Sequence, residues 1–395
     1  MSNFFNAIGV ADMEKVHSAM IAWILDDKND STMPGANTGS LFSTFKLDTR
    51  SDLLCDIFGE SRKKFVSIET FVEWNNIDIL ILTKDQNGQK ERWVIENKLK
   101  SPEHVSNVKG NTPIWQTQKY TKTITNTFGD KGNHYLLLSL TGNSAKSPNG
   151  NWIAKKYEDL RNILSSNHTS ASPIIEEYYN AIKVLSDTLN DFLTNYSNYP
   201  IAISSKTKNA NKSQVLLKSI NPNEKYIIEN GLETIFQKCL LIDQMSLYRR
   251  TCLRLPYTID ETHGNALLDI ERGQLKGNVN GAYQEYYVQF EFQNGSFKVQ
   301  IHQINNNGEM RPKDDFLNEW ETVFDEVAKN NTNWKKYLPK PNNKRPFISI
   351  SKKDKNWYKN IQQSWRNGFT DCEKILQDLI TEFYTQNGTQ LVLVP

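Results

Sequence analysis

Two apolar segments separated by a turn constrain this chain more than any other feature. Residues 76–83 read NIDILILT, residues 92–99 read RWVIENKL, and the polar segment between them contains Asn87-Gly88. Because Asn-Gly accommodates the positive φ angles of a tight hairpin turn, this pattern predicts two antiparallel strands. Residues 67–74, SIETFVEW, alternate like a further strand. We therefore expect a three-stranded meander.

The meander lies within a helix-rich N-terminal region. Residues 12–26 place Met13, Val16 and Met20 at helical spacing. A short apolar strand is expected over 134–140, and further helices are expected over 114–128, 154–166 and 173–193. This order predicts a mixed α/β domain over residues 1–203.

The second half of the chain has a different pattern. Residues 204–214 are polar and basic and are typical of a linker. Strand-like and helix-like segments follow, at 265–271, 283–292, 296–304, 316–327, 345–352 and 372–384. We expect an α+β domain over residues 204–395, with a role in substrate binding or regulation.

Composition narrows the class of protein. The four cysteines lack Cys-x-x-Cys spacing, and the first residues show no basic segment followed by an apolar run. No apolar run approaches the roughly 20 residues that span a bilayer. We expect a cytoplasmic protein without a membrane segment. Because the net charge is only +2, a surface that binds a polyanion must be local.

The strand over 92–98 ends in charged residues. Glu96 and Lys98 are two residues apart and share one face of the strand, whereas Asn97 points to the other face. Asp78 is the one charged residue of the preceding strand. If the two strands pair through the Asn87-Gly88 turn, the carboxylates of Asp78 and Glu96 approach each other. Such carboxylates repel unless a positive charge neutralises them.

A hard divalent cation is one source of that charge. Mg²⁺ takes one or two carboxylates and keeps several waters. Asp78, Glu96 and the backbone carbonyl of Asn97 are therefore candidate ligands for Mg²⁺, which Mn²⁺ can replace. Lys98 is then placed to orient or help to deprotonate an attacking water, which suits phosphodiester hydrolysis. The alternative is a strand that emerges into solvent and ends in a surface ion pair.

The order Asp, then Glu-x-Lys, found here in NNIDILI and VIENK, resembles the PD-(D/E)xK nuclease superfamily. The resemblance implies a restriction-endonuclease-like mixed sheet flanked by helices. It also implies Mg²⁺-dependent hydrolysis of nucleic acid, usually DNA and often in defence against foreign DNA. Since the superfamily often carries an acidic residue on the helix before the sheet, the implied catalytic residues are Glu14, Asp78, Glu96 and Lys98.

The following predicted helix extends the resemblance. Gln116 and Tyr120 match a Gln-x-x-x-Tyr pattern found in one branch of the superfamily, and four-residue spacing puts them on one helix face. The resemblance implies that both residues hold the substrate backbone near the scissile phosphate.

The first predicted helix is similar to the Glu-x-x-His-Ser opening of a bacterial family within this superfamily. The matching residues are Glu14, His17 and Ser18, followed by a Gly-x-x-Phe stretch at 39–42. The family's His-Gly-Leu-Gly is replaced here by PGANTG. His17 also shares a helix face with methionines, which favours a structural role for its ring over contact with the site.

A basic segment lies in the second half. Residues 329–366 contain eleven Lys or Arg, one acidic residue, and interleaved Trp and Tyr. Basic residues hold phosphates and aromatic rings stack on bases, so Lys352, Lys353, Lys355 and Trp357 are candidate substrate-binding residues. The alternative is that the charges are solvated and the Trp rings belong to the core.

The sequence leaves two rival functions open. One is a nucleic-acid-binding sensor or partner-dependent module that does not cleave by itself, and the other is an RNase acting on cellular RNA. The expected partner is nucleic acid, with DNA ahead of RNA, and a homodimer or a partner protein of a defence system is also open.

Overall fold

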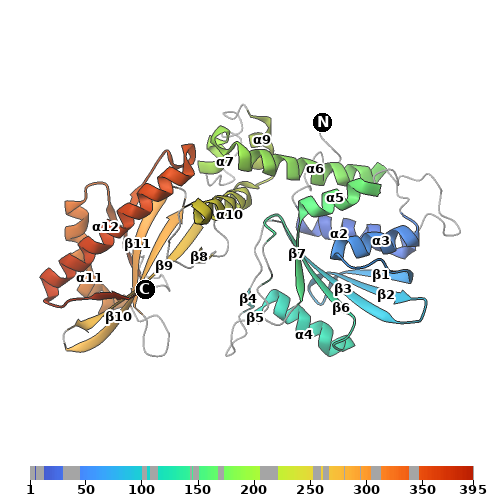
Figure 1. The fold of residues 1–395 in the computed structure, drawn as a ribbon, viewed down its shortest axis with the longest axis horizontal. Helices are drawn as coiled ribbons and strands as arrows, with labels where there is room; N and C mark the ends of the chain where they lie inside the picture. Colours follow the sequence, from blue (N-terminus) through green and yellow to red (C-terminus); the bar gives the residue numbers. More distant parts are fainter. Residues whose placement is uncertain are drawn as a thin grey trace. The chain divides into compact units, whose positions relative to one another are not determined.

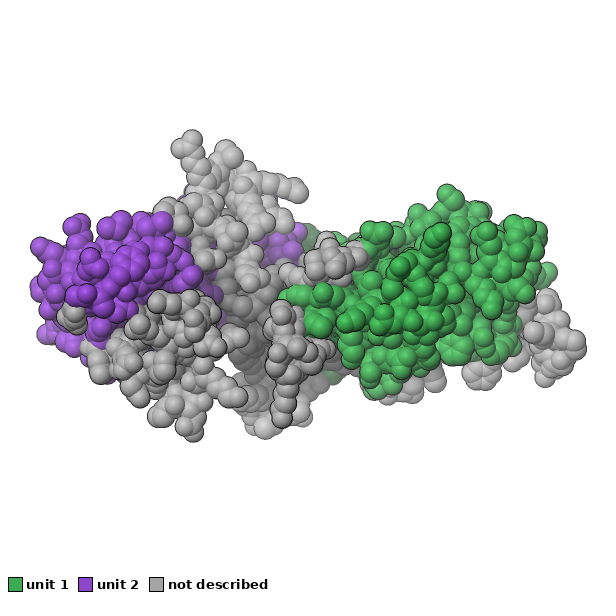
Figure 2. Space-filling view, turned by 90° about the horizontal axis from the view of Figure 1, so that it is seen from below, with its two compact units in different colours: residues 1–194, 207–239 green, residues 195–206, 240–395 purple. Residues whose placement is uncertain are grey.

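The computed structural model describes residues 5, 13–29, 45–99, 105–106, 114–142, 145, 151–167, 173–204, 221–251, 259–260, 267–279, 281–293, 295–303, 313–337 and 347–394. The chain divides into two compact units, an N-terminal unit (1–194 and 207–239) and a C-terminal unit (195–206 and 240–395), coloured separately in Figure 2. The Gly-x-x-Phe stretch at 39–42 lies outside the described residues, as does all but the first residue of the predicted linker over 204–214.

The N-terminal unit contains a mixed five-stranded sheet in the order β1-β2-β3-β6-β7 (Figure 1). Its strands are β1 (Phe65–Trp74), β2 (Ile77–Asp85), β3 (Lys90–Lys98), β6 (Asn133–Ser139) and β7 (Trp152–Lys156). The first three are antiparallel neighbours, whereas β6 is parallel to β3 and β7 is parallel to β6. The expected meander and the mixed α/β fold are confirmed.

The N-terminal unit contains seven described α-helices, of which the last continues into the C-terminal unit. They are α2 (Glu14–Leu25), α3 (Leu47–Phe58), α4 (Gln116–Phe128), α5 (Tyr157–Asn167), α6 (Pro173–Thr194), α9 (Pro222–Glu229) and α10 (Glu233–Thr251). Two short strands, β4 (Val105–Ser106) and β5 (Ile114–Trp115), precede α4. Figure 1 shows α4 on one face of the sheet and α2, α3 and α5 on the other.

The hairpin between β2 and β3 sets the register of the sheet. Gly88 has a φ of 79°, and the Asp85 carboxylate accepts hydrogen bonds from the backbone N–H groups of Asn87 (2.9 Å) and Gln89 (2.8 Å). Lys84 lies opposite Lys90, and the same register continues along both strands. The turn predicted at Asn87-Gly88 therefore brings the other ends of the two strands together.

The end of α2 fastens the edge strand β1. Asp27 Oδ2 accepts from the backbone N–H of Ile68 (2.9 Å), and Asp26 Oδ2 accepts from the N–H (3.2 Å) and hydroxyl (2.9 Å) of Thr70. Because an edge strand exposes N–H groups that attract other strands, these two aspartates satisfy donors at the edge of the sheet.

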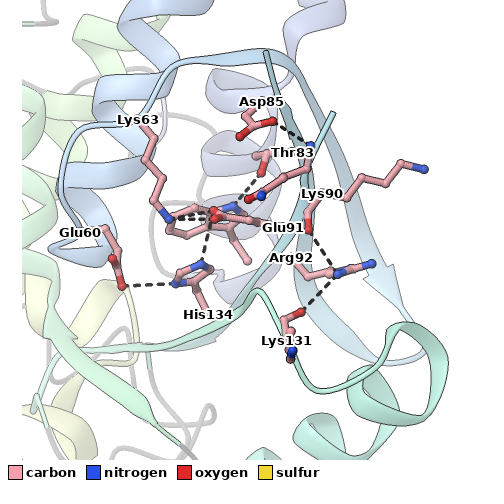
Figure 3. Close-up of polar contacts among 11 residues, drawn as sticks. Glu60, Lys63, Thr83, Asp85, Lys90, Glu91, Arg92, Lys131 and His134 are labelled. Atoms are coloured by element: carbon pink, nitrogen blue, oxygen red, sulfur yellow. Dashed lines mark hydrogen bonds and ion pairs between the residues drawn. The ribbon is translucent and has the colours of Figure 1, made fainter. Parts of the chain in front are cut away.

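A polar cluster closes the far end of β3 (Figure 3). The His134 ring stacks on Trp93 at 3.9 Å between ring centroids, with Nδ1 3.3 Å from Glu60 and Nε2 3.4 Å from Glu91. Lys63 Nζ lies 2.9 Å from the Glu91 carboxylate. This cluster belongs to the hairpin end of the strand, away from Glu96 and Lys98.

The C-terminal unit has an antiparallel sheet in the order β12-β13-β11-β10-β9-β14, with β8 beside β9. Its elements are α7 (Pro200–Ser204), β8 (Ile259–Asp260), β9 (Leu267–Val279), β10 (Ala282–Gln293), β11 (Ser296–Gln303), α11 (Lys313–Asn330), β12 (Lys335–Tyr337), β13 (Phe347–Lys353), α12 (Ile361–Asn387) and β14 (Val392–Val394). Strands and helices occur together, as the α+β prediction requires.

The structure differs from the sequence-based expectations at two places. The helix expected over 154–166 begins only at Tyr157, because residues 152–156 pair in parallel with β6. Strand β7 has only five residues, which is too short for an alternating pattern to predict it, and it forms by pairing with β6. The helices α9 and α10 were not expected from the sequence.

Candidate active site

Two carboxylates meet where β2 and β3 approach their shared end. Ile79 lies opposite Ile95, so the next pair outward is Asp78 and Glu96. Both point to the face that α4 covers, because Leu80 and Val94, two residues further along each strand, pack against that helix. Asp78 Oδ2 accepts a hydrogen bond from the backbone N–H of Asn97 at 2.7 Å.

Lys98 completes the cluster on the same face. Its Nζ lies 2.6 Å from Glu96 Oε1, and the Glu96 side chain is fully buried while that of Lys98 is 9% exposed. Burial excludes the alternative of a surface ion pair at a solvated strand end. The structure thus brings together three of the four residues that the resemblance implied to be catalytic.

The environment shifts the protonation of all three groups. Burial raises the pKa of Glu96 from its ordinary 4.5 to about 8, and the charge of Asp78 adds to the rise although Lys98 opposes it. Burial also raises the pKa of Asp78, against the effects of Lys98 and the Asn97 N–H. Burial lowers the pKa of Lys98, but the carboxylates of Glu96, Asp78 and Glu14 outweigh it and raise that pKa overall.

These residues fit a divalent cation. Among the described residues, the Glu96 carboxyl contacts the ammonium of Lys98 and shares a side-chain hydrogen bond with the Asp78 carboxyl. Two carboxyl groups can share a hydrogen bond only while one of them is protonated, and a bound cation can take the place of that proton. No group of three or more His, Cys, Asp or Glu poised to hold a metal occurs in the described part of the chain. Two carboxylates nevertheless suffice for Mg²⁺, which keeps several of its waters.

Glu14 is the first residue of α2 and lies beside this cluster. Its charge acts on both Asp78 and Lys98, although its side chain is only partly buried. One turn later, His17 is 2% exposed, and its Nδ1 lies 3.2 Å from the hydroxyl of Tyr178 on α6. His17 therefore packs between helices, in agreement with a structural role.

The structure brings Gln116 and Tyr120 together on one face of α4, and substrate contact by the partly exposed Gln116 stays a prediction. Gln116 Nε2 donates to the Tyr120 hydroxyl at 2.6 Å, and that hydroxyl donates to the backbone carbonyl of Asn76. Tyr120 is 2% exposed and packs in the apolar cluster under α4. The expectation that Tyr120 contacts the substrate is therefore corrected, because its hydroxyl ties α4 to the turn that precedes Asp78.

The turn that Tyr120 holds has an unusual backbone. Asn75 and Asn76 connect β1 to β2 with φ angles of 50° and 66°, which asparagine tolerates better than most residues. The Asn75-Asn76 pair is the feature of the sequence from which this turn could have been predicted. The turn leads within two residues to Asp78.

The basic segment of the C-terminal unit is only partly available to a ligand. Trp357 is 4% exposed and packs edge-on against Phe292 at 5.1 Å, so the prediction that it stacks on bases is wrong. Lys352 Nζ lies 2.7 Å from Asp371 Oδ2. Lys353 and Lys355 are exposed, and phosphate contact by these two remains a prediction.

No helix among the described residues is long and apolar enough to cross a membrane. The described cysteines, Cys55, Cys239 and Cys372, are buried.

Comparison with known proteins agrees with this geometry. Residues 2–198 match the family model of the PD-(D/E)XK nuclease superfamily. No curated protein and no solved structure matched the chain. The matched range contains the whole five-stranded sheet, with Asp78, Glu96 and Lys98 at its strand ends. The N-terminal half of this chain therefore belongs to the PD-(D/E)XK nuclease superfamily.

Proposed function

We propose that this chain is a Mg²⁺-dependent nuclease that hydrolyses phosphodiester bonds of DNA in the cytoplasm, in bacterial defence against foreign DNA. The observation that carries the proposal is the buried cluster of Asp78, Glu96 and Lys98, in which a fully buried carboxylate lies beside a second carboxylate. Mn²⁺ is expected to replace Mg²⁺, since both take oxygen ligands.

Each residue of the cluster has a part in adding water across a P–O bond. Asp78, Glu96 and the Asn97 carbonyl would hold the cation, which offsets the negative charge that develops on the phosphate. Because the surrounding carboxylates raise its pKa, Lys98 is protonated at neutral pH and orients the attacking water as a hydrogen-bond donor. The Glu96 carboxyl lies 2.6 Å from this ammonium group, and a bound cation would favour the ionised form that pairs with it. Glu14 adds negative charge beside the same cluster.

The preference for DNA is supported by the usual substrate of the superfamily rather than by a contact in this structure. The C-terminal unit is proposed to bind substrate or to regulate cleavage, with Lys353 and Lys355 as exposed basic residues for phosphates. We also propose that the protein acts as a homodimer or together with a partner protein of a defence system.

The test is a substrate panel with the full-length protein. Plasmid DNA, linear DNA and RNA are incubated with Mg²⁺, with Mn²⁺ and with EDTA. The same panel is run with Asp78→Asn and with a matched control, Asp85→Asn, at the hairpin end of the same strand. Cleavage of DNA that requires a cation, is lost in Asp78→Asn and persists in Asp85→Asn supports the proposal.

Other outcomes select the rival functions. Cation-dependent cleavage of RNA alone would replace the DNA assignment by an RNase. Binding of nucleic acid without cleavage of any substrate would favour a sensor, or a module that needs a partner protein to become active.

A further inference from the structure

Asn97 lies between Glu96 and Lys98, yet its side chain enters the opposite face of the sheet. It is completely buried. Its Nδ2 donates to the backbone carbonyl of Glu14 at 2.9 Å and to the hydroxyl of Ser18 at 3.1 Å. Its Oδ1 accepts from the hydroxyl of Tyr157 at 2.5 Å. One amide thus joins strand β3 to helix α2 and helix α5.

The orientation of this amide is determined by its partners. A carbonyl only accepts hydrogen bonds, so the NH₂ group must face Glu14. The Ser18 hydroxyl donates its own proton to the same carbonyl at 3.0 Å and is left to accept from Asn97. Both hydrogens of the amide and its oxygen are therefore used, which leaves the side chain one arrangement.

The amide acts at the point where α2 begins. Glu14 is the first residue of that helix, and the N-cap residue Met13 makes no side-chain capping bond. The bond from Asn97 therefore connects the first turn of α2 directly to the strand end that carries Glu96 and Lys98. It sets the distance between the Glu14 backbone and the cluster on which the Glu14 charge acts.

Tyr157 holds the other side of the amide. It is fully buried at the start of α5, and its ring lies edge-on to the His17 ring at 5.1 Å between centroids. His17 in turn contacts the hydroxyl of Tyr178 on α6. The amide of Asn97 is thus held directly by α2 and α5, and the ring contacts of Tyr157 and His17 connect it to α6.

We propose that Asn97 is a positioning residue of the nuclease site, whose side chain, held by Tyr157, fixes Glu14 and the start of α2 relative to Asp78, Glu96 and Lys98. The expected effect of an Asn97 substitution on cleavage rests on the proposed function. The expected effect on cation affinity can be measured without cleavage, because Asp78 and Glu96 remain present when the side chain of Asn97 is changed.

Four full-length variants test the proposal. Asn97→Ala removes the amide, Asn97→Asp replaces a donor by an acceptor facing the Glu14 carbonyl, and Tyr157→Phe removes one hydroxyl. The control is Thr83→Val, which breaks the buried bond from Trp93 Nε1 (3.0 Å) in the far part of the same sheet, where Thr83 is shown in Figure 3. Thermal unfolding identifies the variants that fold.

Three quantities are measured for each variant that folds. Calorimetry gives the Mn²⁺ affinity, and single-turnover cleavage of the preferred substrate gives the rate and the substrate concentration for half-maximal rate. We expect Asn97→Ala and Asn97→Asp to bind Mn²⁺ about tenfold more weakly, as is usual when a group that orients metal ligands is lost. We expect their single-turnover rate to fall by about 100-fold, the cost of small misplacements in a site.

The control separates positioning from stability. Thr83→Val should keep both the cleavage rate and the Mn²⁺ affinity within threefold of wild type. Tyr157→Phe should lose about tenfold in cleavage rate. The substrate concentration for half-maximal rate should stay unchanged in both variants. The proposal is overturned if Asn97→Ala keeps its rate within threefold of wild type, or if Thr83→Val loses as much rate at an equal loss of stability. If the wild type cleaves nothing, the proposed function fails, and unchanged Mn²⁺ affinity in Asn97→Ala would still overturn the positioning role.

Discussion

The burial of Glu96 makes a quantitative prediction about stability in the absence of metal. Its pKa is about 8 in the folded chain, compared with an ordinary value of 4.5. Because this pKa is raised on folding, the folded state prefers the protonated acid. The contribution of Glu96 to stability is complete below pH 4.5 and is lost as the pH rises through about 8.

The magnitude follows from the size of the rise. At 1.36 kcal/mol per pH unit, a rise from 4.5 to about 8 corresponds to about 5 kcal/mol once the group is fully ionised. Glu96→Gln keeps the shape of the protonated acid and cannot ionise. In EDTA, we expect the free energy of unfolding of Glu96→Gln minus that of wild type to grow by about 4 kcal/mol between pH 5 and pH 9.

The assay is urea unfolding of both full-length proteins in EDTA at a series of pH values. Saturating Mg²⁺ should reduce the difference in free energy of unfolding between Glu96→Gln and wild type at pH 9. The reason is that a cation that binds the ionised Glu96 stabilises the wild type and not the variant. A difference that stays constant within about 1 kcal/mol from pH 5 to pH 9 would contradict a raised pKa of Glu96 in the folded chain, because such a pKa makes the free energy of unfolding depend on pH.

Three further predictions concern other parts of the chain. Tyr120→Phe removes the hydroxyl that holds the turn before β2, so we expect a loss of about 1–3 kcal/mol in urea unfolding together with slower cleavage. Gly368→Ala places a Cβ 2.3 Å from the ring of Phe297, so we expect thermal unfolding to show a loss of about 1–3 kcal/mol, although alanine favours helices. Replacing both Lys353 and Lys355 by Glu should weaken DNA binding, as measured by fluorescence anisotropy. The slope of log K against log salt concentration should become shallower by roughly 0.9 for each phosphate that these lysines neutralise. An unchanged slope would exclude phosphate contact by these two lysines.

The sequence predicted the core of the candidate site because that part of the fold is local. Asn87-Gly88 fixes the hairpin, the hairpin fixes the register, and the register places Asp78 opposite Glu96. Side-chain alternation then puts Lys98 beside Glu96 and sends Asn97 to the other face. Each step depends on neighbours within about one strand length, which sequence patterns report well.

The predictions that failed depend on contacts between distant residues. Helical spacing brings Gln116 next to Tyr120, but the bond to Asn76, which removes Tyr120 from the substrate surface, requires α4 to pack on the sheet. Trp357 is buried because it packs against Phe292, far along the chain, so a basic neighbourhood could not reveal its place in the core. The role of the Asn97 amide also depends on α2 and α5 meeting β3.

The most direct test of the central claim is the single-turnover rate of cleavage in Mg²⁺ by Lys98→Ala and Lys90→Ala. Both lysines lie on β3, but only Lys98 is buried beside Glu96. We expect Lys98→Ala to fold and to lose at least about 100-fold in rate, the scale of removing one group that acts in the transition state, while Lys90→Ala keeps the wild-type rate. Equal rates for the two variants would contradict this expectation and would place the chemistry outside the Asp78, Glu96 and Lys98 cluster.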